Sequence, residues 1–163
     1  MTTSYTDAHL IFRDYHTKAS VYVGNMYAAS DATFFIRNHI GAVVNATPDV
    51  PLHFEGRNIA YKRLVVDDSG RNHDMHIMYN AFPEVVGWIN KQMMDGNNIL
   101  IHCHAGMQRS ATIAAAYMLR YYRRPLDSII EFMQRRRPIV FGFGRNVNFI
   151  GPLRKWAKTN GVK

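Results

Sequence analysis

The sequence predicts an α/β fold in which helices cover both faces of one sheet. Short apolar, β-branched runs alternate with helix-like stretches in the first part of the chain, and the remainder is helical. Strands interleaved with helices form layered domains, because each helix packs its apolar face on the sheet. The 163 residues, of which 47% are hydrophobic, are enough for one core. We therefore predict a single domain over residues 1–163.

Four segments are predicted to be strands, because each is rich in β-branched or aromatic residues and is bounded by Gly, Asn, Asp or Pro. They are residues 20–23, 42–45, 61–66 and 98–102. Four strands are therefore the minimum for the sheet.

Five segments have a helical pattern. Two of them, residues 32–39 and 74–94, lie between the strands, and three more follow the last strand, at residues 110–123, 127–137 and 146–158. Pro83 lies inside the second segment. Because proline cannot donate a backbone hydrogen bond, we expect Pro83 to start the main helix after a short irregular turn.

Composition limits the compartment and the partners. The 20 Lys and Arg residues outnumber the 12 Asp and Glu residues, so the surface attracts anions such as phosphorylated proteins, nucleic acid or acidic lipid. A single cysteine excludes internal disulfides, which favours a reducing compartment. The polar segment 1–10 lacks the apolar core of a signal peptide, and no run of about 18 apolar residues appears, so we expect neither secretion nor a membrane span. We predict a cytoplasmic protein, with the nucleus as the alternative; no feature predicts an oligomeric state.

One segment combines the features of a phosphate-binding loop. The apolar strand 98–102 leads into Cys103. A short loop centred on Gly106 follows, and Arg109 then opens an alanine-rich helix. Such a loop can turn successive backbone N–H groups inward, where they and the positive end of the helix bind a tetrahedral anion. The same field favours the thiolate of Cys103, so we predict a nucleophile there rather than a small core residue.

Two side chains at the start of this helix extend the prediction. The guanidinium of Arg109 can give a planar, two-pronged contact to two phosphate oxygens, a geometry that lysine cannot match. The hydroxyl of Ser110 can donate to the sulfur of Cys103 when that sulfur leaves a phosphocysteine intermediate. Ser110 could instead cap the helix, and the two roles are compatible.

The segment from His102 to Ser110 resembles the signature of the cysteine phosphatases, in which five residues separate the cysteine from an arginine followed by Ser or Thr. Four further segments look like landmarks of the dual-specificity protein phosphatase domain: residues 21–25, 43–47, 61–68 and 146–153. The resemblance covers about residues 21–157. It implies a mostly parallel sheet of about five strands flanked by helices, and a two-step hydrolysis without metal or cofactor. It also implies a pocket shallow enough for phosphothreonine or phosphoserine as well as phosphotyrosine in proteins.

The resemblance assigns further residues to the site. The residues between the cysteine and the arginine would form the substrate pocket, namely His104, Ala105, Gly106, Met107 and Gln108. A general acid must protonate the departing oxygen, and a carboxylic acid on a nearby loop is the usual provider. The family keeps that acid after the strand ending at Val66, where its usual acidic-Asp-Ser pattern matches Asp68. The alternatives are Asp67, Asp74 or no dedicated acid.

Departures from the family pattern leave other substrates open. Phosphoinositide phosphatases of the superfamily tend to carry lysines inside the loop, where this chain has Met107. The RNA 5′-triphosphatase relatives usually have Asn before the arginine and Thr-Gly after it, where this chain has Gln108 and Ser110-Ala111. We predict a protein phosphatase, with lipid or RNA 5′ ends as alternatives, and a catalytically idle phosphate-binding module as the alternative from another class.

Two groups of arginines invite a nucleic-acid or docking interpretation. Arg135, Arg136 and Arg137 end one predicted helix, where cations are also favoured by the helix dipole. Arg120, Arg123 and Arg124 lie near the end of another. We interpret both groups as solvated faces. The remaining histidines show no metal-ligand spacing, so we predict no bound metal.

Overall fold

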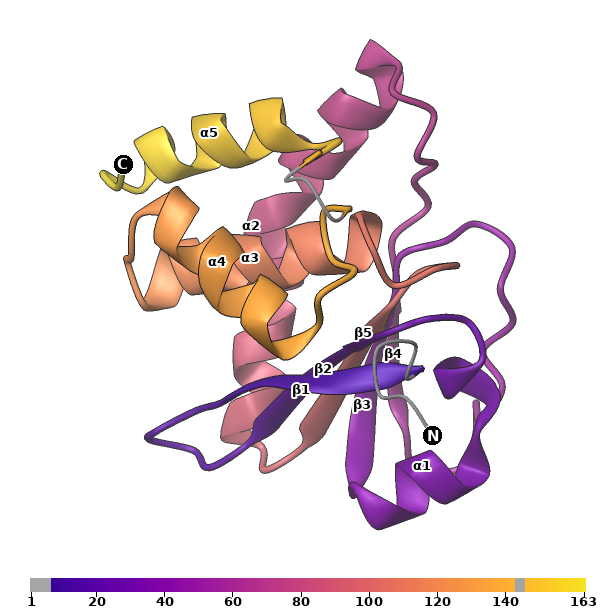
Figure 1. Ribbon diagram of the computed structural model, residues 1–163. Helices are drawn as coiled ribbons and strands as arrows, with labels where there is room; N and C mark the ends of the chain where they lie inside the picture. The colour runs from indigo at the N-terminus through magenta and orange to yellow at the C-terminus, as the bar shows by residue number, and fades with distance from the viewer. Residues whose placement is uncertain (1–6, 143–145) are drawn as a thin grey trace.

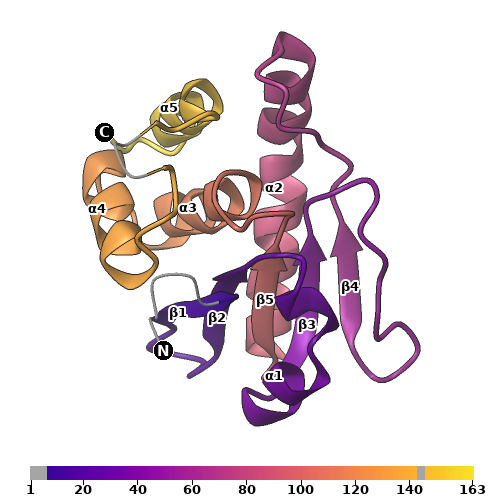
Figure 2. The ribbon, with the colours of Figure 1, turned by 45° about the vertical axis from the view of Figure 1, so that its right-hand side comes forward.

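The computed structural model describes residues 7–142 and 146–163. Its centre is a five-stranded sheet with the order β1-β2-β5-β3-β4, which runs from left to right in Figure 2. Four strands are parallel: β2 (Ser20–Gly24), β3 (Ile40–Asn45), β4 (Ala60–Arg63) and β5 (Asn98–His102). At the edge of the sheet, β1 (Ala8–Arg13) pairs antiparallel with β2. The predicted mostly parallel, five-stranded α/β fold is confirmed.

Helices cover both faces of this sheet (Figure 1). One face carries α1 (Ala32–Arg37) and the short 3-10 helix η1 (Ala28–Ser30). The other carries α2 (Asn72–Met94), α3 (Arg109–Tyr121), α4 (Leu126–Arg136) and α5 (Ile150–Thr159). Because side chains alternate along a strand, Val43 of β3 faces the small α1 core and its neighbour Val44 faces the large core.

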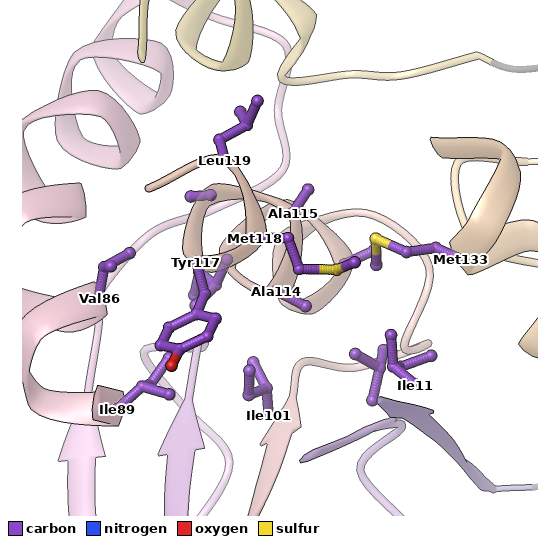
Figure 3. Close-up of a cluster of buried hydrophobic side chains, with 14 of the residues drawn as sticks. Ile11, Val86, Ile89, Ile101, Ala114, Ala115, Tyr117, Met118, Leu119 and Met133 are labelled. Atoms are coloured by element: carbon purple, nitrogen blue, oxygen red, sulfur yellow. The ribbon is translucent and has the colours of Figure 1, made fainter. Parts of the chain in front are cut away.

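The helix that follows the predicted loop runs through the middle of the large core. Every residue of α3 from Arg109 to Leu119 is buried. Figure 3 shows Ala114 and Ala115 of this helix in the cluster, with Met118 beside Met133 of α4. Since its surroundings fix α3 on all sides, the beginning of the helix is held rigidly at the end of β5.

The structure corrects three expectations about the elements. Helix α2 is continuous through Pro83, whose ring lies on the exposed side, so the carbonyl that loses its partner can bind water. Helix α5 begins only at Ile150, and β4 ends at Arg63. The sequence does not predict β1, since a register shift between Leu10 and Phe12 breaks its alternation. Residues 1–6 of the polar N-terminal segment lie outside the described part.

Among residues 7–142 and 146–163, no helix is both long enough and apolar enough to cross a membrane.

Candidate active site

The carboxyl ends of the parallel strands meet at one edge of the sheet, which is where ligands bind in open α/β sheets. There the loop 103–108 joins β5 to α3. A cavity of about 310 Å³ opens beside it, lined by Asp68, Cys103, His104, Ala105, Met107, Gln108, Arg109, Gly142, Asn146 and Asn148. Of the predicted site residues, only Gly106 and Ser110 are missing from this lining. The fold thus brings segments far apart in the sequence to one place.

The carbonyl groups of the loop are bonded to parts of the protein outside the cavity. The carbonyl of His104 accepts a hydrogen bond from the backbone N–H of Met26, at 2.9 Å. The carbonyl of Met107 accepts one from the backbone N–H of Phe141, at 2.8 Å. Both ends of the loop are therefore tied to neighbouring segments.

The two carbonyls between them bind a buried side chain. Nε of Arg137 donates to the carbonyl of Gly106 at 2.9 Å, and its Nη2 donates to the carbonyl of Ala105 at 3.3 Å. Four consecutive carbonyls, those of residues 104–107, are thus bonded on the outer side of the loop.

This arrangement turns the amides of the loop towards the cavity. In a trans peptide, the C=O group and the following N–H group point in opposite directions. The N–H groups of residues 105–108 therefore face inward, and no backbone acceptor within the described residues binds them. They lie at the N-terminus of a 13-residue helix, whose dipole also favours negative charge. The loop is a cradle for a tetrahedral anion.

Gly106 is required for the shape of the cradle. Its φ is +67°, in the left-handed region that favours glycine. A Cβ atom there would lie 2.6 Å from the backbone of Gly24 and 2.7 Å from Nη2 of Arg137. No larger residue fits without moving the loop away from β2.

The sulfur of Cys103 lies at the bottom of the cradle. The residue is 3% exposed and makes no disulfide. Its Sγ lies 3.3 Å from Oγ of Ser110. The alternative role of Ser110 as a helix cap is wrong, because α3 begins at Arg109 and its N-cap is Gln108. The serine hydroxyl is therefore placed against the thiol.

Arg109 connects the cradle with the segment that carries the predicted acid. Its Nη1 donates to the carbonyl of Val66 at 2.9 Å, two residues before Asp68. The side chain is 9% exposed and lines the cavity. One guanidinium thus fixes the position of the acidic segment relative to the anion cradle.

Of the acid candidates, only Asp68 lines the cavity. Nδ2 of Asn148 donates to its Oδ1 at 3.0 Å. Gln108 holds the segment that carries Asn148, because its amide donates to the carbonyl of Asn146 at 2.7 Å and accepts from the N–H of Asn148 at 3.0 Å. The Gln108 side chain, expected to bind substrate, therefore also places Asn148 on the acid. In the sequence, Asn148 belongs only to the family landmark 146–153, and sequence reasoning gave it no role in the site.

The other two carboxylates have different surroundings. Asp67 is exposed and does not line the cavity. Burial opposes ionisation of Asp74, but hydrogen bonds from Ser69 outweigh that effect and lower its pKa. Asp74 does not line the cavity. Asp74 instead anchors the turn after Asp68.

Two histidines flank Cys103 and differ in their surroundings. Burial lowers the pKa of His102 to about 4, so this ring is neutral at physiological pH and adds no positive charge beside the sulfur. His104 lies at the rim, where its Nε2 is hydrogen-bonded to Oδ1 of Asp49 at 2.7 Å. That hydrogen bond lowers the pKa of Asp49. The rim of the cavity therefore carries the carboxylate of Asp49 beside the imidazole of His104.

Comparison with known proteins shows the family. Residues 21–159 match the catalytic domain of the dual specificity phosphatases. The chain belongs to this family. It is 36% identical over 133 residues to human dual specificity protein phosphatase 1, covering 82% of this chain and 34% of that protein. With mouse dual specificity protein phosphatase 2 it is 33% identical over 133 residues, 82% of this chain and 39% of the relative. The chain spans about a third of the length of these relatives.

Solved structures share the fold of this dual specificity phosphatase domain. A mouse putative dual specificity phosphatase in complex with zinc tungstate superimposes with a TM-score of 0.80 at 21% identity, over 98% of this chain and 91% of that one. A human tyrosine phosphatase-like serine/threonine/tyrosine-interacting protein gives a TM-score of 0.77 at 17% identity, over 93% and 96% of the chains. At such identities the likeness shows the fold alone. The predicted family and its cysteine phosphatase fold are confirmed.

Arg137 is the residue of the phosphatase domain that the sequence interpretation placed wrongly. We expected a solvated side chain, but Arg137 is 0% exposed and its Nη1 donates to Nδ1 of His9 at 2.8 Å. Burial lowers its pKa to about 10, and the negative charge of Cys103 and then that of Asp7 act against this decrease. The guanidinium therefore stays charged at neutral pH, behind the loop that holds the sulfur.

Replacing Arg137 by methionine should loosen the loop 103–108 and remove a positive charge that acts on Cys103. We expect alkylation of Cys103 by neutral iodoacetamide to slow, because a positive charge that interacts with the sulfur is lost. The value of kcat/KM should fall roughly 10- to 100-fold, since the cradle loses two of its outer hydrogen bonds. Alkylation across a pH series and steady-state kinetics measure the two effects.

Arg136→Met is the matched control, because this neighbouring arginine is exposed and stacks on Phe132 at 3.8 Å. It should leave the alkylation profile and kcat/KM unchanged. Arg137→Lys, which keeps the charge but not the fork, should give an intermediate kcat/KM. A folded Arg137→Met variant with the wild-type alkylation profile would show that Arg137 has no influence on the sulfur.

Proposed function

We propose that this domain hydrolyses phosphotyrosine and phosphothreonine or phosphoserine in proteins, without a metal, through a phosphocysteine intermediate. The observation that carries the proposal is the convergence of the inward N–H groups of residues 105–108, the Cys103 sulfur and the Asp68 carboxyl on one cavity. A phosphate held in the cradle has the sulfur on one side and a proton donor within the same pocket.

In the first step, the thiolate of Cys103 attacks phosphorus and forms the S–P bond. The P–O bond to the substrate side chain breaks, and the departing oxygen takes the proton of Asp68. Arg109 and the loop amides bind the equatorial oxygens, where negative charge spreads in the transition state. The Val66 contact keeps Arg109 and Asp68 in a fixed relation during the step.

In the second step, a water molecule attacks the phosphocysteine. Asp68, now a carboxylate, takes a proton from that water, and inorganic phosphate forms as the S–P bond breaks. The electron pair of that bond returns to Cys103. The hydroxyl of Ser110, 3.3 Å from Sγ, donates a hydrogen bond to the leaving thiolate. Its effect should be confined to this second step.

A catalytically idle phosphate-binding module is the alternative from another class, and the fold alone does not decide against it. The same fold occurs in the human protein described as tyrosine phosphatase-like. What favours catalysis here is that Cys103, Arg109 and Asp68 are all present and that two of their side chains are positioned by named contacts.

The proposal also covers partners and compartment. Phosphorylated proteins are the substrates that fit the dual specificity family, and lipid or RNA substrates are less favoured because Met107 and Gln108 stand where those relatives differ. We place the protein in the cytoplasm, with the nucleus as the alternative, because its sole cysteine must stay reduced to act as a thiolate.

The test is a comparison of substrates in the presence of a chelator. Peptides with phosphotyrosine and with phosphothreonine should both be hydrolysed. Each should give a kcat/KM about tenfold or more above those of a soluble phosphoinositide and of an RNA 5′ triphosphate, because only the peptides match the pocket. Strict selectivity for tyrosine, or a preference for the lipid or the RNA, would overturn the substrate assignment. Oxyanion binding without turnover of any of them would support the idle module.

A further inference from the structure

A second and larger cavity lies at the far end of α3 from the anion cradle. Its volume is about 570 Å³, within the range of sites that bind ligands. Aromatic and aliphatic side chains of β1, α3 and α4 form most of its lining, among them Phe12, Tyr121, Ile129 and Phe132. Such a lining can bury one bulky apolar side chain of a partner.

The charged residues that line this cavity are both arginines. Arg124 precedes α4 and Arg135 lies in the last turn of α4, and both are exposed. Arg124 lies two residues before the helix begins, and the rise from Leu126 to Arg135 is about 14 Å along the helix axis. The two carboxylates of α4, Asp127 and Glu131, do not line the cavity. The cavity thus has an apolar floor between two separated positive charges.

A third carboxylate near the cavity is bonded within the protein. Asp14 is 6% exposed, and its oxygens accept hydrogen bonds from the hydroxyl of Tyr122 at 2.7 Å and from the N–H of Thr17 at 2.8 Å. It is therefore turned towards these donors, and the charged side chains that line the cavity are those of the arginines.

We propose that this cavity docks an extended segment of the protein substrate that carries one bulky apolar side chain between acidic residues. Four extended residues span about 14 Å, which is comparable with the rise of α4 between the two arginines. A small anion could reach only one of the two arginines at a time, whereas a peptide can pair with both while its central side chain fills the cavity.

The position of the cavity links docking to catalysis, and this link rests on the proposed function. The 13 residues of α3 run from the anion cradle to the cavity, a distance of about 20 Å. A docking segment and a phosphorylated residue on the same chain must therefore be at least about six extended residues apart. Docking would raise the effective concentration of the phosphorylated residue at the cradle.

Binding is measured first, with no phosphate present. The probe is a fluorescein-labelled peptide, Glu-Asp-Gly-Leu-Gly-Asp-Glu, followed by fluorescence anisotropy at near-physiological salt. Arg124→Glu and Arg135→Glu should each weaken its binding by about tenfold or more, because each reversal removes an attraction and adds a repulsion. Replacing the central leucine of the peptide by serine should weaken binding by a similar factor. Arg154→Glu, an equal charge change at an exposed residue of α5, is the control and should have little effect.

Kinetics test the link to catalysis. A phosphotyrosine peptide joined to the docking segment by flexible linkers of increasing length should have a kcat/KM about tenfold above the same peptide without the segment, once the linker spans the distance. Arg124→Glu should remove this gain and leave hydrolysis of the short phosphopeptide unchanged.

Three results would overturn the proposal. One is equal binding of the leucine and serine peptides, which would indicate charge attraction alone. Another is an equal loss of affinity in Arg154→Glu, and the third is tighter binding of an RNA oligonucleotide than of the peptide. The docking proposal and the proposed phosphatase activity can be tested independently. The anisotropy experiment measures docking even if no phosphopeptide is hydrolysed.

Discussion

Replacing Cys103 by serine should abolish turnover and leave the binding of phosphate and tungstate almost unchanged. The serine hydroxyl stays protonated where the thiol ionises, so the nucleophile is lost. The cradle is not touched, because its inward amides belong to residues 105–108 and its shape depends on contacts of Arg137, Met26 and Phe141. We expect kcat to fall roughly 10⁴-fold or more, as in other enzymes that lose their catalytic nucleophile.

Turnover of an aryl phosphate and calorimetric titration with tungstate measure the two properties in the same preparation. Turnover above about a hundredth of the wild-type rate would remove Cys103 from the role of nucleophile, since losing one costs far more. Loss of tungstate binding in a folded variant would mean that the sulfur itself, and not the amide cradle, holds the anion.

Replacing Asp68 by asparagine should lower kcat by roughly 10²- to 10⁴-fold for an alkyl phosphate, the range for losing one general acid. The substitution keeps the size of the side chain and its contact with Asn148. With an activated aryl phosphate the loss should be much smaller, because a good leaving group needs little protonation.

Asp67→Asn is the matched control, because it makes the same chemical change one residue away at an exposed side chain outside the cavity. It should change kcat little with either substrate. If Asp67→Asn shows the leaving-group dependence and Asp68→Asn does not, the general acid is Asp67.

The anion cradle could be predicted from the sequence because its parts are contiguous. Strand, cysteine, glycine-centred loop and helix follow one another, and β5 has the predicted bounds Asn98–His102. Local rules of turn and helix formation were therefore enough. Asp68 lies far from this segment in the sequence, and only the family resemblance brought it into the site. Its contact with Asn148 depends on how the segment after α4 packs, which no local pattern encodes.

Arg137 shows why a charge pattern misled the interpretation. Cations at the end of a helix are usually solvated, but the buried residues of α4 recur at Leu126, Ile130 and Met133, and Arg137 continues this spacing. The periodicity places it on the inner face despite its charge. The cost of burying a cation is then offset by the loop carbonyls and by the charge of Cys103. An arginine that continues the spacing of the apolar residues of a helix is a sequence signal for a buried, functional side chain.

Trapping the covalent intermediate is the decisive test of a phosphocysteine mechanism at Cys103. Wild-type protein is mixed with a phosphotyrosine peptide, quenched in acid within milliseconds, digested and analysed by mass spectrometry, with the Cys103→Ser variant treated in parallel. We expect one phosphoryl group on the wild-type peptide that contains Cys103. It should accumulate early and disappear once the substrate is consumed, and the variant should carry none. Turnover without any phosphoryl group on that peptide, or with the group on another residue, would contradict this mechanism.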